Sequence, residues 1–173
     1  WRIAPTDDVR KTSRRYRGDT LILETLFETD EGSVLLIDLM PIRGDASDIV
    51  RVLVGKEGRV PVRSLLDLRF EYGKLRPLIR KVESEEVAAV AGPHGVVLRS
   101  DRPLEVNDSA VTCDCVIEEG ERISFVLTYF PSHHDIPEPV DAEAALAKTE
   151  DYWNEWAGRC TYRGPYRDEV VRS

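Results

Sequence analysis

Cysteine is scarce in this chain, which has three cysteines and one methionine among its 173 residues. Cys113 and Cys115 lie two residues apart in a strand-like run, where such side chains share a face, and Cys160 is far from both. An odd count without a repeat spacing argues against a disulfide framework and indicates reduced thiols in a cytosolic-type compartment. We therefore expect three small, buried hydrophobic cysteines and a cytoplasmic protein.

Long apolar runs and an excess of basic residues are also missing. No stretch reaches the roughly 18 apolar residues that a membrane-spanning helix needs. The chain has 24 basic and 32 acidic residues, a net charge of −8, which argues against a nucleic-acid surface. The glycines at 92 and 95 lie in a turn rather than in a phosphate-binding loop. No signal peptide is visible, and because residue 1 is Trp rather than Met we expect the chain to be part of a longer product.

Many short segments of alternating or β-branched apolar residues are present between residues 9 and 130, separated by Gly, Pro, Asp and Asn turns. The stretch from 16 to 40 predicts a β-hairpin with strands at 20–29 and 34–40, and Gly32 is expected to supply a positive φ in its loop. Both strands are apolar on both faces, so both faces need cover. Further strands are predicted at 1–3, 49–54, 60–72, 78–82, 87–91, 96–99, 110–118 and 122–130, with a turn at 55–58 and a polar loop at 7–15. The fold class is therefore mainly β, an antiparallel two-sheet sandwich formed by residues 1–130.

The pattern changes at residue 131. Three prolines predict an extended linker over 131–140. Asp141 is the expected N-cap of a linker helix over 141–158, with Gly158 as its C-cap. Apolar residues at helical spacing form one stripe along it, namely Ala142, Ala145, Leu146, Thr149, Trp153 and Trp156. A second helix is expected from Tyr166, with Pro165 in its first turn.

Four segments carry a resemblance to a known family: residues 14–41, 60–73, 125–133 and 141–173. Their most specific pieces are DLMP at 38–41, RFEYG at 69–73, WNEW at 153–156 and CTYRGP at 160–165. Over nearly its whole length the chain resembles the N-terminal region of bacterial glycoside hydrolase family 15 proteins, which are glucoamylase-like and trehalase-like enzymes. The resemblance implies a super-β-sandwich, a linker helix, and a catalytic (α/α)₆ barrel of which residues 159–173 would be only the start.

For the parent enzyme the resemblance implies inverting hydrolysis of an α-glucosidic bond by two glutamates of the barrel. No catalytic residue of the family falls on this chain, which is expected to be inactive alone and to need no cofactor. Its expected partners are its own catalytic domain and, through the parent enzyme, α-glucan, maltooligosaccharide or trehalose. Two alternatives stay open: a carbohydrate-binding module with an exposed row of aromatics, and a scaffold or dimerisation module that forms a homo-oligomer.

Candidate site residues follow from this organisation. Trp153, Trp156 and Tyr152 are predicted to dock the linker helix between the sandwich and the barrel. Asp38 lies inside an apolar run and is predicted to be a buried structural carboxylate bonded to backbone N–H groups or to an arginine such as Arg43 or Arg69.

Three other clusters carry simpler expectations. His133, His134 and Asp135 lack a further ligand at metal spacing, so no metal site is expected there. The aromatic residues Phe70, Tyr72, Tyr129 and Phe130 could stack on a sugar ring, but core packing is favoured because the first two share a face with Leu66 and Leu68. The basic cluster of Arg10, Lys11, Arg14, Arg15 and Arg17 could bind phosphate, but a solvated segment whose charges pair with the surplus carboxylates is favoured.

Overall fold

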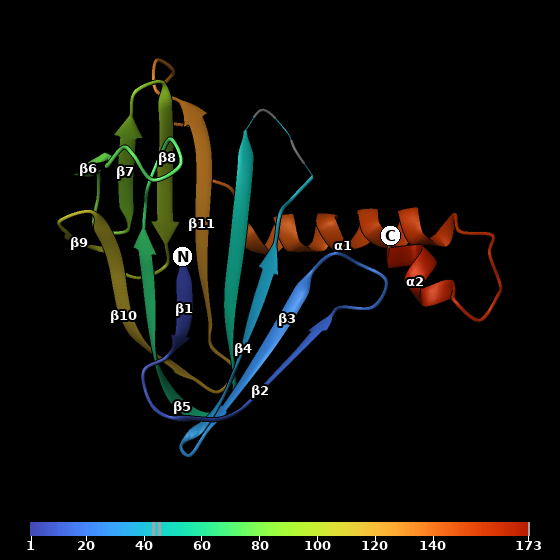
Figure 1. Ribbon diagram of the computed structural model, residues 1–173. Coiled ribbons are helices and arrows are strands. Elements are labelled where there is room, and N and C mark those ends of the chain that lie inside the picture. Colours follow the sequence, from blue (N-terminus) through green and yellow to red (C-terminus); the bar gives the residue numbers. More distant parts are fainter. Residues whose placement is uncertain (43, 45, 173) are drawn as a thin grey trace.

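A computed structural model describes residues 1–42, 44 and 46–172 of the chain. The elements follow one another as β1 (Arg2–Pro5), β2 (Val9–Tyr16), β3 (Leu23–Thr29), β4 (Gly32–Leu39), β5 (Ser47–Asp67), β6 (Leu78–Lys81), β7 (Glu86–Ala91), β8 (His94–Ser100), β9 (Glu105–Asn107), β10 (Ala110–Glu118), β11 (Arg122–Pro131), α1 (Ala142–Gly158) and α2 (Arg167–Arg172). Every strand pairing is antiparallel (Figure 1). The predicted mainly β fold is thus confirmed.

Strand β5 belongs to both layers of the sandwich. Its first part pairs with β4 and β11 in the sheet ordered β2-β3-β4-β5-β11-β8-β7-β6, which we call sheet B. Its second part pairs with β1 and β10 in a smaller sheet completed by β9, which we call sheet A. One long strand therefore carries the chain from one layer to the other.

The turn predicted at residues 55–58 is wrong, because β5 continues through these residues. Gly58 has φ +62°, and a Cβ at Gly55 would overlap the carbonyl oxygen of Glu118. The glycines therefore allow a bend and a close approach of backbones within a strand, rather than a reversal of the chain. Gly32 acts similarly: its φ is not positive, but a Cβ there would meet the carbonyl oxygen of Glu57.

Two apolar cores lie on the two faces of sheet B. Between the sheets, Val34, Leu36, Leu53 and Phe125 pack with residues of sheet A such as Val62. On the other face, Ile37, Val50, Val52 and Val126 pack against Ala142, Ala145 and Leu146 of α1. The prediction that the hairpin strands need cover on both faces is confirmed, and α1 provides the second cover.

Strand β2 corrects the polar loop predicted at 7–15. All eight of its residues are exposed, and it pairs only with β3, with Thr12 opposite Phe27 and Arg14 opposite Thr25. An edge strand can form its backbone hydrogen bonds with one neighbour without burying either side-chain face. The sequence of β2 therefore does not need alternating apolar residues, which is why it resembles a polar loop. The predicted pairing of its basic residues is confirmed for Arg10, Lys11 and Arg15, which contact Asp30, Glu28 and Glu24.

The strand predicted over 60–72 ends at Asp67. Glu71, Tyr72 and Gly73 all have positive φ, at 49°, 56° and 89°, and Phe70 forms an isolated bridge with Leu75. A left-handed backbone cannot continue a pleated strand. The strand therefore ends, although the apolar alternation of the sequence continues beyond its last paired residue. The hairpin at Gly92 and the strands β7, β8, β10 and β11 appear close to their predicted positions.

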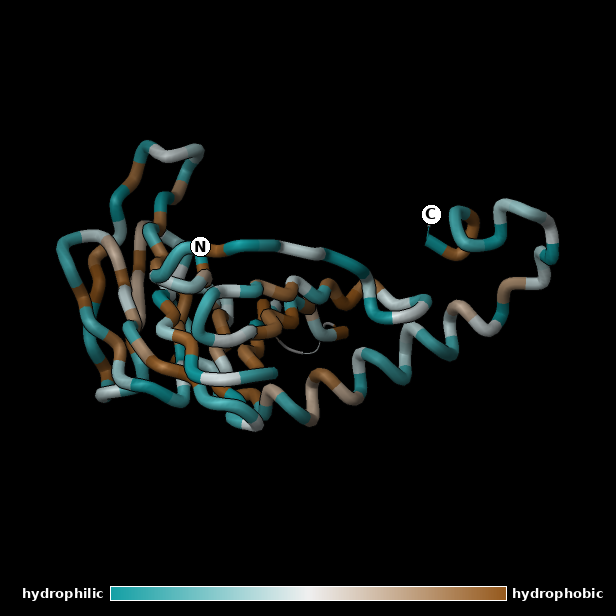
Figure 2. Tube along the Cα trace, turned by 90° about the horizontal axis from the view of Figure 1, so that it is seen from below, coloured by the Kyte–Doolittle hydropathy of each residue, from teal (hydrophilic) through white to brown (hydrophobic). Residues whose placement is uncertain are grey.

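Helix α1 lies against sheet B with its first part and projects beyond the β2 and β3 side of the sandwich with its second (Figures 1 and 2). Asp141 is the N-cap, as predicted, and its side chain accepts a hydrogen bond from the N–H of Ala144 at 3.0 Å. The helix includes Gly158 and is capped by Arg159 in a right-handed conformation, which corrects the predicted C-cap. Helix α2 begins one residue after the predicted Tyr166, and Ser173 lies outside the described residues.

Candidate interdomain docking surface

Ion pairs fasten α1 to the sandwich at two points. Arg122 on β11 donates to both carboxylate oxygens of Glu143, at 2.7 and 2.9 Å. Arg17, between β2 and β3, donates to Glu150 at 2.9 Å and to Glu24 on β3 at 2.8 Å. Together with the apolar contacts of Ala145 and Leu146, these pairs hold the first part of the helix in one orientation.

The carboxylate of Glu24 is the centre of the second contact. Its side chain is only 7% exposed and lies between Arg17 and Arg15. Burial by itself would raise the pKa of Glu24, but hydrogen bonds and the charges of Arg17 and Arg15 outweigh burial and lower the pKa below its usual value. The sequence alone does not single out Glu24, because a glutamate on a strand face opposite apolar residues is typical of a solvated position.

The projecting part of α1 carries the three aromatic residues predicted to dock. Trp153 is half-buried and meets Tyr152 edge-on, with ring centroids 5.2 Å apart. Trp156 is 54% exposed and Tyr152 is 40% exposed. The structure brings all three together on one stretch of helix, and the sandwich leaves Trp156 largely uncovered.

A small cavity of about 150 Å³ lies beneath the two indoles. Its other walls are Asp19, Thr20 and Leu21 before β3, and Asp168, Val171 and Arg172 of α2. Arg167 of α2 pairs with Asp19 at 3.3 Å, and the guanidinium carbon of Arg172 lies 4.8 Å from the centre of the Tyr16 ring. Helix α2 thus folds back beside the tryptophans, although none of its described residues is buried.

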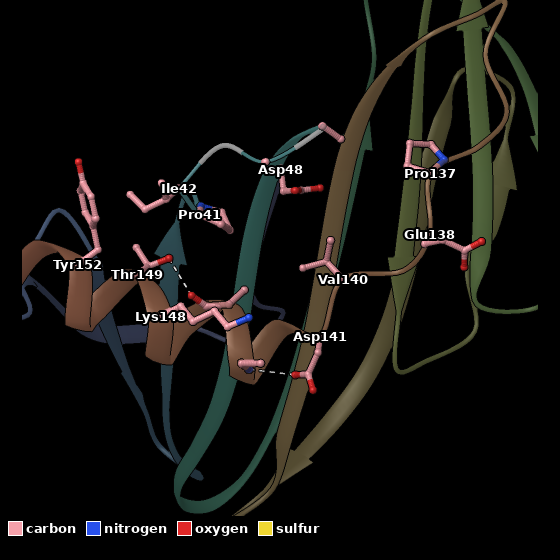
Figure 3. Close-up of a pocket in the computed structure, with 14 residues that line it drawn as sticks. Pro41, Ile42, Asp48, Pro137, Glu138, Val140, Asp141, Lys148, Thr149 and Tyr152 are labelled. Atoms are coloured by element: carbon pink, nitrogen blue, oxygen red, sulfur yellow. Dashed lines mark hydrogen bonds between the residues drawn. The ribbon is translucent and has the colours of Figure 1, made fainter.

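A larger groove of about 740 Å³ follows the other side of α1 (Figure 3). Its walls come from the segment before β5, the end of the proline linker and the first turns of the helix. Tyr152 and Thr149 lie beside Pro41 and Ile42, and Asp48, Glu138 and Lys148 supply charge. Ile42 in this groove is exposed, as is Met40 two residues before it in the sequence. We call the aromatic end of α1 together with this groove the candidate docking surface.

Asp38 is paired with an arginine, as predicted, but this arginine is Arg51 rather than Arg69, and the carboxylate is not fully buried. Arg51, directly opposite it on β5, donates to both carboxylate oxygens at 2.7 and 3.3 Å, and the Asp38 side chain is 25% exposed. Arg51 also donates to the carbonyl of Trp1 and lies over its ring. Arg69 instead contacts Asp67 and Ser109, and Arg43 lies outside the described residues. Cross-strand register selects the partner, and the sequence could not predict that register.

The aromatic residues near the RFEYG motif are not all in the core, which corrects the favoured expectation. Phe130 is buried, but Phe70 stacks on the ring of His94. The Tyr129 hydroxyl and His94 Nδ1 form a hydrogen bond of 3.0 Å at the surface. Tyr72 is fully exposed at 102% of its reference area. The φ values of Glu71 and Tyr72 turn the chain away from the buried face that Leu66 occupies.

Other predicted positions lie apart from this surface. His133 and His134 meet edge-on with their ring centroids 4.4 Å apart. Among residues 1–42, 44 and 46–172, no three His, Cys, Asp or Glu side chains are grouped closely enough to hold a metal ion. Cys113 is buried, while Cys115 and Cys160 are half-buried, and all three are free thiols. Neither described helix is long and apolar enough to cross a membrane.

No protein-family model matches this chain, and no curated protein matches it. One similar solved structure is described as "Putative kojibiose phosphorylase from human microbiome". It aligns with 98% of this chain at a TM-score of 0.47 and 10% sequence identity. The chain spans about a quarter of that protein's length, 26%.

Proposed function

We propose that this chain is the non-catalytic N-terminal domain of an inverting α-glucoside hydrolase of the glucoamylase-like or trehalase-like type in glycoside hydrolase family 15. Its role is to hold an (α/α)₆ catalytic domain through the linker helix and to shape one wall of the substrate entrance. The parent enzyme would act on α-glucan, maltooligosaccharide or trehalose in the cytoplasm. The four resembling segments, which include both tryptophans of α1 and residues 160–165, support this family assignment.

The observation that carries the proposal is the unequal burial of α1. The sandwich buries Ala145 and Leu146 and fixes Glu143 and Glu150 by ion pairs. Further along the helix, Tyr152 and Trp156 remain 40% and 54% exposed. Large aromatic side chains are costly to leave in water and are enriched at protein interfaces. A helix held rigidly at one end and aromatic at the other is suited to fix a second domain at a defined angle.

The first test is an activity assay on maltose and trehalose. The 173-residue chain alone is expected to show no turnover, and the full-length gene product is expected to release glucose with inverted anomeric configuration, which NMR detects directly. Turnover by the chain alone would place the chemistry within these residues and overturn the proposal.

The second test addresses docking. In the full-length protein, Trp156→Ser combined with Tyr152→Ser is expected to separate one cooperative melting transition into two, because the domains lose shared buried area. The control is Asp151→Ser, an exposed polar residue on the same helix turn, which should leave a single transition. A single unchanged transition in the double variant would show that these rings do not couple the domains.

The carbohydrate-binding alternative is less well supported. It requires a coplanar row of exposed rings on one sheet face. The exposed rings of the described residues belong instead to different elements, with Tyr72 in a loop, Tyr129 on β11 and Tyr152 and Trp156 on α1. Titration with maltooligosaccharide, followed by NMR shifts of these residues, tests this alternative separately.

A further inference from the structure

Residues 72–81, which include β6 and the end of the loop before it, carry four cationic side chains without a carboxylate partner among the described residues. Lys74, Arg76, Arg80 and Lys81 are exposed, and none forms a side-chain hydrogen bond or ion pair within the described residues. The basic residues of β2 provide the contrast, since Arg10, Lys11 and Arg15 each contact a carboxylate. We call residues 72–81 the basic segment.

The same segment exposes apolar side chains. Tyr72 and Leu78 are exposed at 102% and 80%, and Leu75 is also exposed. Single exposed apolar residues are common, but several within one short segment mark an interaction surface. A surface that combines unpaired cations with exposed apolar rings and chains suits a partner face that is both apolar and acidic.

The shape of this segment is fixed in advance. Glu71 and Tyr72 adopt left-handed φ values, at a cost of about 1–2 kcal/mol per residue. Backbone hydrogen bonds between Phe70 and Leu75 close the loop, and the Glu71 carboxylate lies 3.4 Å from His94 Nε2 on β8. A strained conformation that local contacts maintain is typical of functional surfaces, because pre-organisation lowers the entropy lost on binding.

A second copy of this chain is a poor occupant. Within the part of the chain that the structure describes, β6 pairs only with β7, so one of its edges is open. Symmetric pairing of two such edges would bring Arg80 and Lys81 near the same residues of the copy. Like charges in such positions repel, and edge lysines and arginines are a common protection against self-pairing. Nucleic acid is also disfavoured, because the chain as a whole carries −8.

We propose that the basic segment binds an acidic, partly apolar face of the catalytic domain, as a contact separate from the docking surface on α1. This inference rests on the proposed function, which supplies that domain. In Figure 1 the green loop before β6 lies in front of β7 and β8, on the side of the sandwich away from the projecting end of α1. Two contacts on different sides would restrain the domain against rotation about the helix, which a single contact would allow.

Hydrogen exchange on the full-length protein and on the 173-residue chain tests both contacts in one measurement. Amides of residues 74–81 are expected to exchange at least about tenfold more slowly in the full-length protein, because covering an edge strand blocks local opening. Slower exchange near Trp156 without any change at 74–81 overturns this inference and leaves the proposed function standing. No change at either place overturns both.

Charge reversal identifies the chemistry of the contact. In the full-length protein, Arg76→Glu with Arg80→Glu is expected to abolish the protection of residues 74–81 and to leave that near Trp156 intact. The matched control reverses Arg14 and Lys56, two exposed cations elsewhere without an ion pair among the described residues, and should change neither. Protection that survives the double reversal refutes an acidic partner face. A doubled mass in sedimentation of the 173-residue chain, lost in the variant, would instead assign the segment to self-association and also overturn the inference.

Discussion

Replacement of Glu24 by Gln tests the ion-pair network that joins α1 to sheet B. The substitution keeps the size of the side chain and removes its charge. In the native protein the carboxylate accepts from Arg17 Nε at 2.8 Å and from Arg15 Nε at 2.9 Å. Arg17 retains Glu150 after the substitution, so the loss is confined to the bonds that Glu24 makes.

The two bonds contribute unequally. Arg15 is largely exposed, at 79% of its side chain, so its pair with Glu24 contributes a few tenths of a kcal/mol. Arg17 is 26% exposed. A charge-assisted hydrogen bond in such a setting contributes about 1.5–3 kcal/mol, against about 1 kcal/mol for a neutral one. We expect Glu24→Gln to lower the free energy of unfolding by about 1–2 kcal/mol, which lowers Tm by about 2–8 °C for a chain of this size.

The pH dependence has a defined sign. Because the pKa of Glu24 is lowered in the folded protein, its charge stabilises the fold at pH values above the ordinary glutamate pKa of about 4.3. That stabilisation is lost as pH falls from there through the lowered folded pKa. The difference in stability between the native chain and the variant should therefore be largest near neutral pH and shrink in acid.

Urea unfolding of the 173-residue chain, followed by circular dichroism between pH 7 and pH 3, provides the measurement. Asp114→Asn is the control, because Arg63 contacts both oxygens of Asp114 but more than half of each side chain is exposed. That substitution should cost less than about 1 kcal/mol. Equal losses for the two variants, or a Glu24→Gln difference that does not shrink in acid, would refute the reasoning.

Three further predictions concern other parts of the sandwich. Gly55→Ala should destabilise the chain by more than about 3 kcal/mol in urea unfolding, because its Cβ would overlap the Glu118 carbonyl. Gly92→Ala, with φ +58° but open space around it, should cost only about 1 kcal/mol. Similar costs for the two variants would contradict the steric argument. Tyr72→Gly should raise the unfolding free energy of the isolated chain by up to about 1 kcal/mol, because glycine removes the strain of the left-handed φ. This gain outweighs the extra entropy that glycine gives the unfolded chain. A loss of stability would mean that the Tyr72 ring makes a stabilising contact. Arg51→Met should lower the free energy of unfolding by about 2–3 kcal/mol, because Asp38 and the Trp1 carbonyl lose their hydrogen-bond donor. Indole fluorescence that does not change on this substitution would argue against the contact between Arg51 and the Trp1 ring.

The sequence by itself determined the class of fold and the position of most elements. Alternation of apolar residues is a local property that survives without knowledge of partners, so it located β3, β4, β7, β8, β10 and β11. The N-cap Asp141 and the stripe of α1 likewise depend only on neighbours along the chain. Strands apolar on both faces required two covers, and the structure supplies them with sheet A and α1.

Only the tertiary structure decided which residues meet across the molecule. Whether Gly55 and Gly58 reverse a chain or bend a strand depends on the backbones of Glu118 and Glu31 that approach them. The partner of Asp38 follows from the register between β4 and β5, and the link from Glu24 through Arg17 to Glu150 joins residues more than a hundred positions apart. Such contacts depend on long-range pairing, which periodicity along one segment does not encode.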